Sequence, residues 1–121
     1  MSNLSILTDE QVVQRFEAVA IDQGDAVDRF QISKVNRLFD KLIALREELS
    51  RRGANRRLLL KPLLFHDNIN VRLRAALALL IIAPEEARAA LQDLADLKIH
   101  QQSVDASMTL DSLDAGEFKA S

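Results

Sequence analysis

The sequence contains no cysteine, tryptophan or tyrosine, and only three glycines and two prolines in 121 residues. Without cysteine, the chain can form no disulfide framework, thiolate metal site or cysteine nucleophile. So few turn-forming residues leave little turn chemistry for an all-β fold. The longest uninterrupted apolar run, 75–84, is too short to span a bilayer. The first residues, MSNLSILTDEQ, lack a basic segment followed by an apolar run, so we expect no signal peptide and a cytoplasmic protein.

The residues that are present favour one helical domain over 1–121. The composition is 48% hydrophobic and 28% charged, which is ordinary for a folded globular protein and argues against disorder. Leucine, alanine, isoleucine and valine supply most of the apolar character. Apolar residues recur at steps of three and four along most of the chain, which is the spacing of an amphipathic helix. We therefore predict an all-α fold.

The helical spacing and the end signals predict about six helices joined by short connections. Thr8 and Gln11 form a capping box at the start of the first, and Gly53 caps the end of the second. The start of the second helix is left open between Asp25 and Ser33. Gly116 lies just past the sixth helix, and we expect 117–121 to be frayed. The predicted spans are about 8–25, a second helix ending at 53, 55–65 with Pro62 inside it, 70–82, 84–97 and 101–114.

The fourth predicted helix is apolar on nearly every side, from Val71 to Ile82. Such a helix is buried on both sides, so we expect it to lie at the centre of the domain. The sixth helix is expected to turn Val104, Met108 and Leu113 inward.

The segment 55–82 resembles a HEAT repeat, a pair of antiparallel helices found in many binding proteins. The resemblance rests on 63–72, LLFHDNINVR, followed by Ala and Leu pairs at 75–76 and 79–80. It implies a HEAT/armadillo-like right-handed superhelix of antiparallel hairpins. It also implies that Asn68 caps the fourth helix. Arg72 is expected to have a structural role by pairing with a carboxylate such as Asp67 or Asp105, and Arg74 is expected to be more exposed.

The whole chain is also similar to DUF2019, a small bacterial family described as a domain of unknown function. Five segments carry this resemblance, namely 34–40, 49–53, the HEAT-like unit, 83–88 and 105–110. The resemblance implies a bacterial, all-helical domain and implies no activity.

Positive charge gathers in the middle of the chain, although the net charge is −2. The basic cluster consists of Arg46, Arg51, Arg52, Arg56, Arg57 and Lys61. The arginine fork suits carboxylate or phosphate, so this cluster is a candidate for binding a partner, an acidic ligand or nucleic acid. The alternative is that neighbouring Asp and Glu neutralise these charges. No aromatic residue for base stacking lies among them, which weakens the nucleic-acid hypothesis.

Asn36 is a second candidate, because it lies beside the apolar stripe of the second helix. Its amide would either hydrogen-bond to another helix and fix the register, which we favour, or line a groove that binds a partner.

No catalytic constellation is recognisable in the sequence. His66 and His100 are far apart and lack a second ligand at helical spacing, and three isolated glycines cannot form a phosphate-binding loop. The adjacent carboxylates 47–48 and 85–86 point about 100° apart on a helix. We therefore expect no metal, no cofactor and no enzymatic activity. The leading hypothesis is a regulatory or immunity-type module that binds a protein partner, and a homo-oligomer is also compatible with the sequence.

Overall fold

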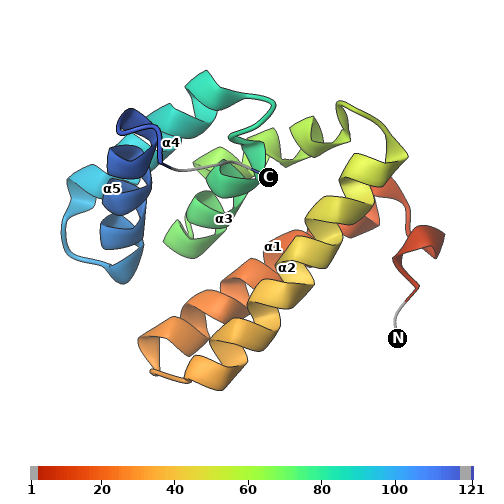
Figure 1. The fold of residues 1–121 in the computed structure, drawn as a ribbon. Helices are drawn as coiled ribbons and strands as arrows, with labels where there is room; N and C mark the ends of the chain where they lie inside the picture. The colour runs from red at the N-terminus through yellow and green to blue at the C-terminus, as the bar shows by residue number, and fades with distance from the viewer. Residues whose placement is uncertain (1–2, 118–120) are drawn as a thin grey trace.

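The computed structural model describes residues 3–117 and 121, which form helices and connecting turns without a strand (Figure 1). The all-α class is therefore confirmed. Most of 117–121, which we expected to be frayed, lies outside the described residues. The elements are the short 3-10 helix η1 (Leu4–Ile6), α1 (Asp9–Asp28), α2 (Ile32–Arg52), the 3-10 helix η2 (Arg56–Phe65), α3 (Ile69–Leu79), α4 (Pro84–Leu97) and α5 (Gln101–Asp114).

Three consecutive hairpins make up the fold, formed by α1 with α2, η2 with α3, and α4 with α5. The middle hairpin lies between the other two in Figure 1, and α3 packs against elements of both. The short connections between helices make sequence neighbours antiparallel in space. This arrangement gives α3 the central place that its apolar sequence predicts.

Several helix ends follow the signals in the sequence. The Thr8 hydroxyl accepts a hydrogen bond from the Gln11 amide at 3.1 Å, and the Gln11 side chain accepts one from the Thr8 amide at 2.9 Å. The Asn68 side chain caps α3 by accepting from the amides of Asn70 and Val71 at 2.9 and 3.1 Å. These bonds satisfy amides that have no partner within the helix.

Three predicted elements differ from the observed ones. The helix expected over 70–82 ends at Leu79, and a turn follows at 80–82. The first helix does not end at 23–25, because α1 continues through Gly24 to Asp28. The third element is a 3-10 helix, with Pro62 inside it, rather than an α-helix. Proline lacks the amide hydrogen that an interior α-helical position uses.

The inward face of α5 was predicted correctly only at Leu113, which is partly buried against the core. Val104 and Met108 are 51% and 63% exposed, while Ala106 and Leu110 are buried. The inward face of α5 therefore begins with Gln102, which is buried as well. Polar residues supply part of this face, so a search for apolar periodicity selects the wrong side of the helix.

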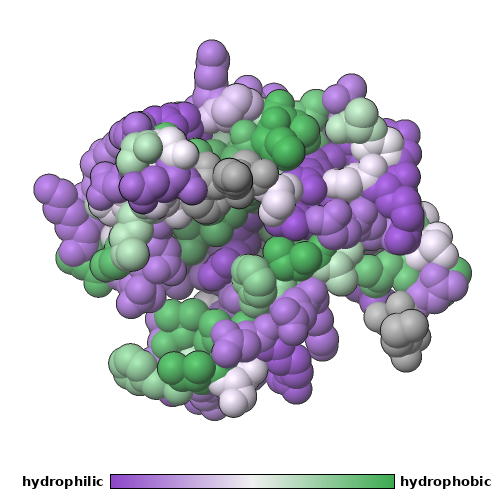
Figure 2. Space-filling model, viewed as in Figure 1, coloured by the Kyte–Doolittle hydropathy of each residue, from purple (hydrophilic) through white to green (hydrophobic). Residues whose placement is uncertain are grey.

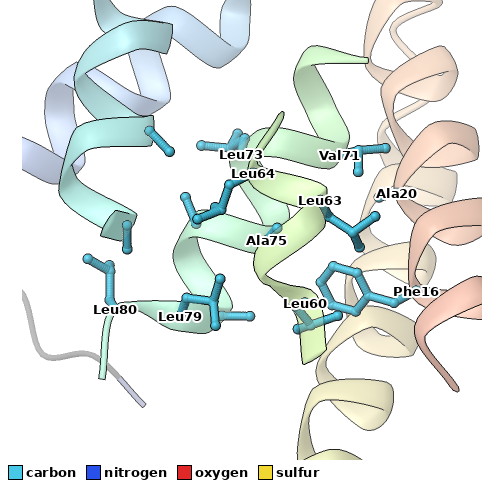
Figure 3. Packing of buried hydrophobic residues seen from close by; sticks show 14 of the residues in the cluster. Phe16, Ala20, Leu60, Leu63, Leu64, Val71, Leu73, Ala75, Leu79 and Leu80 are labelled. Carbon is cyan, nitrogen blue, oxygen red and sulfur yellow. The ribbon is translucent and has the colours of Figure 1, made fainter. Parts of the chain in front are cut away.

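The hydrophobic core gathers around α3 (Figure 3). Val71, Leu73 and Leu79 on this helix have no exposed surface. Phe16 of α1 points toward Leu60 of η2 on one side of the core. Each fully buried side chain of this size contributes about 1.5–3 kcal/mol, so this cluster supplies the main driving force for packing the hairpins.

A buried network of three amide side chains, one from each hairpin, lies beside this core. The Nδ2 of Asn70 donates to the Ala20 carbonyl at 2.7 Å and to Gln23 Oε1 at 3.0 Å. The Nε2 of Gln102 donates to Asn70 Oδ1 at 3.2 Å, and the Nε2 of Gln23 donates to the Val35 carbonyl at 3.3 Å. All three side chains are at least 96% buried, so this amide network is closed to solvent and joins α1, α2, α3 and α5.

Gly24 allows α1 and α3 to approach closely enough for this network. A Cβ added at Gly24 would lie 2.8 Å from the Cβ of Asn70. Real Cβ atoms essentially never come so close, and Cβ of Asn70 is fixed by the backbone of α3. The glycine thus marks a helix-helix contact rather than a helix end.

The first test removes the amide at the centre of the network. Asn70→Ala should lower the free energy of unfolding by about 2–4 kcal/mol, because it leaves more than one buried polar group without a partner. Asn36→Ala is the matched control, since Asn36 is exposed and should change stability by less than about 0.5 kcal/mol. Urea unfolding of the two variants measures both values, and equal effects would contradict the role given to Asn70.

A second test concerns the close approach at Gly24. Alanine in place of a glycine inside a helix ordinarily stabilises it by about 1 kcal/mol. Here we expect the opposite sign, because overpacking of the α1–α3 contact costs about 1–3 kcal/mol. A urea midpoint for Gly24→Ala above that of the natural chain would contradict this prediction, because it would show that α1 and α3 can move apart without loss of stability.

Candidate functional site

Carboxylate side chains lie among the residues of the basic cluster that the sequence predicts. Arg52 contacts Asp9 at 3.0 Å and Glu48 at 2.7 Å. Arg51 pairs with the same Glu48, and Arg56 approaches Asp9 at 3.6 Å. These three arginines are therefore brought together at the end of α2, as expected, but around two acidic side chains.

The remaining three members also have acidic partners. Arg46 contacts Glu47 at 2.6 Å, Arg57 approaches Glu47 at 3.7 Å, and Lys61 contacts Glu86 at 2.6 Å. The hydrogen bond from Arg46 holds the pKa of the Glu47 carboxyl below its ordinary value, and burial lowers the pKa of Arg57. Arg57 is itself buried and donates to Ser50, so it links η2 to α2 in this structure.

In the structure, neighbouring carboxylates therefore neutralise the charges of the basic cluster, which is the alternative considered in the sequence analysis. The side chains of Arg51, Arg56 and Lys61 are 68%, 52% and 45% exposed. Exposed ion pairs of this kind contribute little to stability. Binding of nucleic acid or an acidic ligand by this cluster stays a prediction, and the ion pairs reduce the charge it can offer.

Asn36 is exposed, so the register role that we favoured for it is wrong. The amides that hydrogen-bond between helices are those of Asn70, Gln23 and Gln102. Sequence position could not distinguish them, because an asparagine at 70 also fits the start of a helix.

Arg72 and Arg74 depart from the expected pattern as well. In the described part of the chain, Arg72 forms no ion pair with Asp67 or Asp105, and its Nε is buried without a hydrogen-bond partner. Arg74, expected to be the more exposed, is also half-buried, with its Nε equally unpartnered. A structural role for Arg72 stays a prediction.

The turn between α1 and α2 contains a feature that the sequence did not indicate. Phe30 has a φ of 56°, in the left-handed region that bulky residues rarely adopt. The Gln31 amide donates to the Ala26 carbonyl at 2.9 Å, and the Phe30 amide donates to the Val27 carbonyl at 3.1 Å. These two bonds define a Schellman motif, in which the residue at the position of Phe30 is usually glycine.

The end of α5 provides an internal comparison. There the same pair of bonds is made by Glu117 and Gly116, with Gly116 at a φ of 73°. The chain thus places glycine at one such helix end and phenylalanine at the other. Phe30 is 86% exposed, so no burial of its ring compensates for the unfavourable backbone conformation.

Phe30 belongs to an exposed apolar surface at one end of the molecule. Ile32 and Ile99 are 69% and 79% exposed, and both line, with Phe30, a recess of about 500 Å³ between the α1–α2 turn and the α4–α5 turn. Ile99 follows Lys98, which has a φ of 60°. We call Phe30, Ile32 and Ile99 the apolar end surface, and Asp28, His100 and Gln101 form part of its polar surroundings.

Sequence reasoning missed this surface because its members lie in turns, outside any helical stripe. An aromatic residue directly after Asp28-Arg29, where a helix ends, was the available signal. The tertiary contact between two turns that are about 70 residues apart carries no local signal at all.

Two further observations concern other kinds of site. In 3–117 and 121, no three His, Asp or Glu side chains are grouped so that they could hold a metal ion. Over the same residues, none of the helices combines the length and apolar character that crossing a membrane requires.

Comparison with known proteins first fixes the class. The crystal structure of the protein RPA1889 from Rhodopseudomonas palustris CGA009 superposes with a TM-score of 0.94, at 37% sequence identity and over 100% of both chains. The protein is therefore an all-helical domain with a bacterial structural relative. No curated protein matches the sequence significantly.

The chain belongs to the family described as Domain of unknown function (DUF2019), whose model matches residues 10–114. The family resemblance noted in the sequence is confirmed by this match. The matched region runs from the start of α1 to the end of α5 and includes both turns of the apolar end surface.

A pair of substitutions tests whether Phe30 is strained. Phe30→Gly should raise the free energy of unfolding by about 1 kcal/mol, because glycine adopts the left-handed conformation at no steric cost. Gly116→Ala should lower it by about 1 kcal/mol for the converse reason, since no other atom within 4 Å of its new Cβ could clash. Thermal or urea melts report both changes, and destabilisation by Phe30→Gly would mean that the ring supports the fold.

Proposed function

We propose that the protein is a non-enzymatic module that binds a partner protein through the apolar end surface. The observation that carries this proposal is Phe30, which is almost fully exposed in a backbone conformation that favours glycine. Such local strain persists only where surrounding structure enforces it, and it is concentrated at functional sites. An aromatic side chain that costs stability and is 86% exposed to solvent supports a contact with another molecule.

The chemistry of the surface suits a protein partner. Aromatic residues in the centre of an interface supply most of its binding energy when they enter a pocket on the other protein. Phe30 and Ile99 flank a recess that could in turn receive an apolar side chain of the partner. Polar groups around the recess, such as His100 and Gln101, would form the rim that surrounds such an anchor.

The proposal includes the HEAT-like arrangement and a regulatory or immunity-type role. Three successive hairpins that each pack on the next support a repeat-like architecture, in which binding surfaces are typically formed by neighbouring units. The two turns of the apolar end surface come from the first and the third hairpin, so the stacking of all three hairpins brings them together.

The test compares two phenylalanines of equal exposure. Phe30 and Phe65 are both 86% exposed, but Phe65 does not line the recess. Quantitative pull-downs from the native host should recover a stoichiometric protein with the natural chain and with Phe65→Ala, and lose it with Phe30→Gly. Direct titration of the recovered protein against the purified variants should show a loss of affinity of about tenfold or more for Phe30→Gly alone.

Three outcomes contradict the proposal. Equal loss with both variants would show nonspecific adhesion through exposed rings. Retention of the partner by Phe30→Gly would place its site elsewhere. Self-association of the natural chain that Phe30→Gly abolishes, measured by light scattering over a range of concentrations, would make the surface an interface between copies of this chain.

A further inference from the structure

A second concave site lies between α2, α3 and α5, apart from the apolar end surface. It encloses about 530 Å³, a volume within the range of pockets that hold small molecules. The face shown in Figure 2 is hollowed between α5 and α2. The residues that line the cleft are largely apolar, with two arginines among them, namely Phe16, Phe39, Leu42, Ile43, Arg46, Arg74, Leu77, Ala78, Thr109 and Ser121.

Arg74 is the cation of this cleft that forms no hydrogen bond or ion pair with any residue that the structure describes. Its guanidinium lies over the ring of Phe39, 5.7 Å from the centroid, which is the geometry of a cation–π contact. Its Nε is buried without a hydrogen-bond partner in the described residues. The nearby Asp105 acts on it through charge but forms no ion pair with it in that part of the chain. Burial lowers the pKa of Arg74, so its charge is poorly compensated.

The other polar groups at the cleft are already engaged. Arg46 donates to Glu47 from both Nε and Nη2. Arg57, just behind the cleft, donates to the Ala78 carbonyl at 3.2 Å and to a main-chain oxygen of Ser121, the last residue of the sequence, at 2.6 Å. The Thr109 hydroxyl donates to the Asp105 carbonyl at 2.8 Å. An incoming anion would therefore find its donors on Arg74, with Glu47 and Asp105 as the carboxylates that limit the total charge it meets.

We propose that this cleft binds a small carboxylic acid with an aliphatic or aromatic body, and that Arg74 receives the carboxylate. One arginine with free donors suits a monoanion, since its planar fork matches the two oxygens of a carboxylate. The apolar side chains Leu42, Ile43 and Leu77 offer a surface for the body of the ligand. A carboxylate in the cleft would compensate the charge of Arg74, whose side chain lines it. The site is independent of the proposed protein-binding surface.

Octanoate is a suitable probe, with octanamide as a control of nearly identical shape and no charge. Calorimetric titration should show binding of octanoate and at least tenfold weaker binding of octanamide. Methyl NMR spectra should place the perturbed signals at Leu42, Ile43 and Leu77. Perturbations centred on Ile32 and Ile99 would assign the probe to the apolar end surface and overturn the proposal.

Arg74→Met keeps the length and the apolar stem of the side chain but removes the charge. It should weaken octanoate binding by about tenfold to a hundredfold and leave octanamide unaffected. Arg88→Met is the matched control, because Arg88 is 42% exposed and pairs with Asp114 outside the cleft, and it should change octanoate affinity by less than about twofold.

Arg74→Lys provides a second test of the proposal if Arg74→Met does not fold. It retains the charge without the planar fork, so octanoate should still bind more tightly than octanamide. The proposal is overturned if octanoate does not bind, if octanamide binds equally well, or if Arg74→Met and Arg88→Met weaken binding to the same extent.

Discussion

The amide of Asn70 is the interaction on which the arrangement of the three hairpins depends. Apolar packing around α3 is strong but has no direction, and alanine and leucine surfaces can slide along one another. The amide network adds direction, because Asn70 reaches Gln23 on one side and is reached by Gln102 on the other. Buried amides left unpaired are costly, so only one relative position of the hairpins satisfies all three. Gly24 is required for the same reason, since any side chain there would separate α1 from α3.

Much of the fold could be predicted from the sequence, because local chemistry determines it. The capping box at Thr8, the cap at Asn68, and the central place of α3 follow from residue type and spacing alone. The errors arise where a tertiary contact overrides a local preference. The first helix was predicted to end at about 25, directly after Gly24, but this glycine lies inside α1 and serves a contact with Asn70, 46 positions later. Buried Gln102 likewise reverses the inward face expected for α5.

The candidate sites were less predictable than the fold. Counting basic residues along the chain identified a basic cluster, but it could not show that Asp9 contacts Arg52 and that Glu86 contacts Lys61. Two arginines of nearly identical local sequence also differ in what surrounds them. Arg74 lies over Phe39 and inside a cleft, which its position next to Leu73 does not indicate. The exposed state of Phe30 depends on a backbone conformation that no residue-type preference would assign to phenylalanine.

The span of the amide network along the chain has a consequence for how the protein folds. Its bonds join residues 47 and 32 positions apart, and they close only when all three hairpins are in place. In many repeat proteins, units can be removed or added at the ends because each unit contacts only its neighbours. Here the first and the third hairpin share a partner in the second. Removal of the first or the third hairpin would therefore leave part of the buried Asn70 amide unpaired, which couples the stability of the two outer hairpins through the middle one.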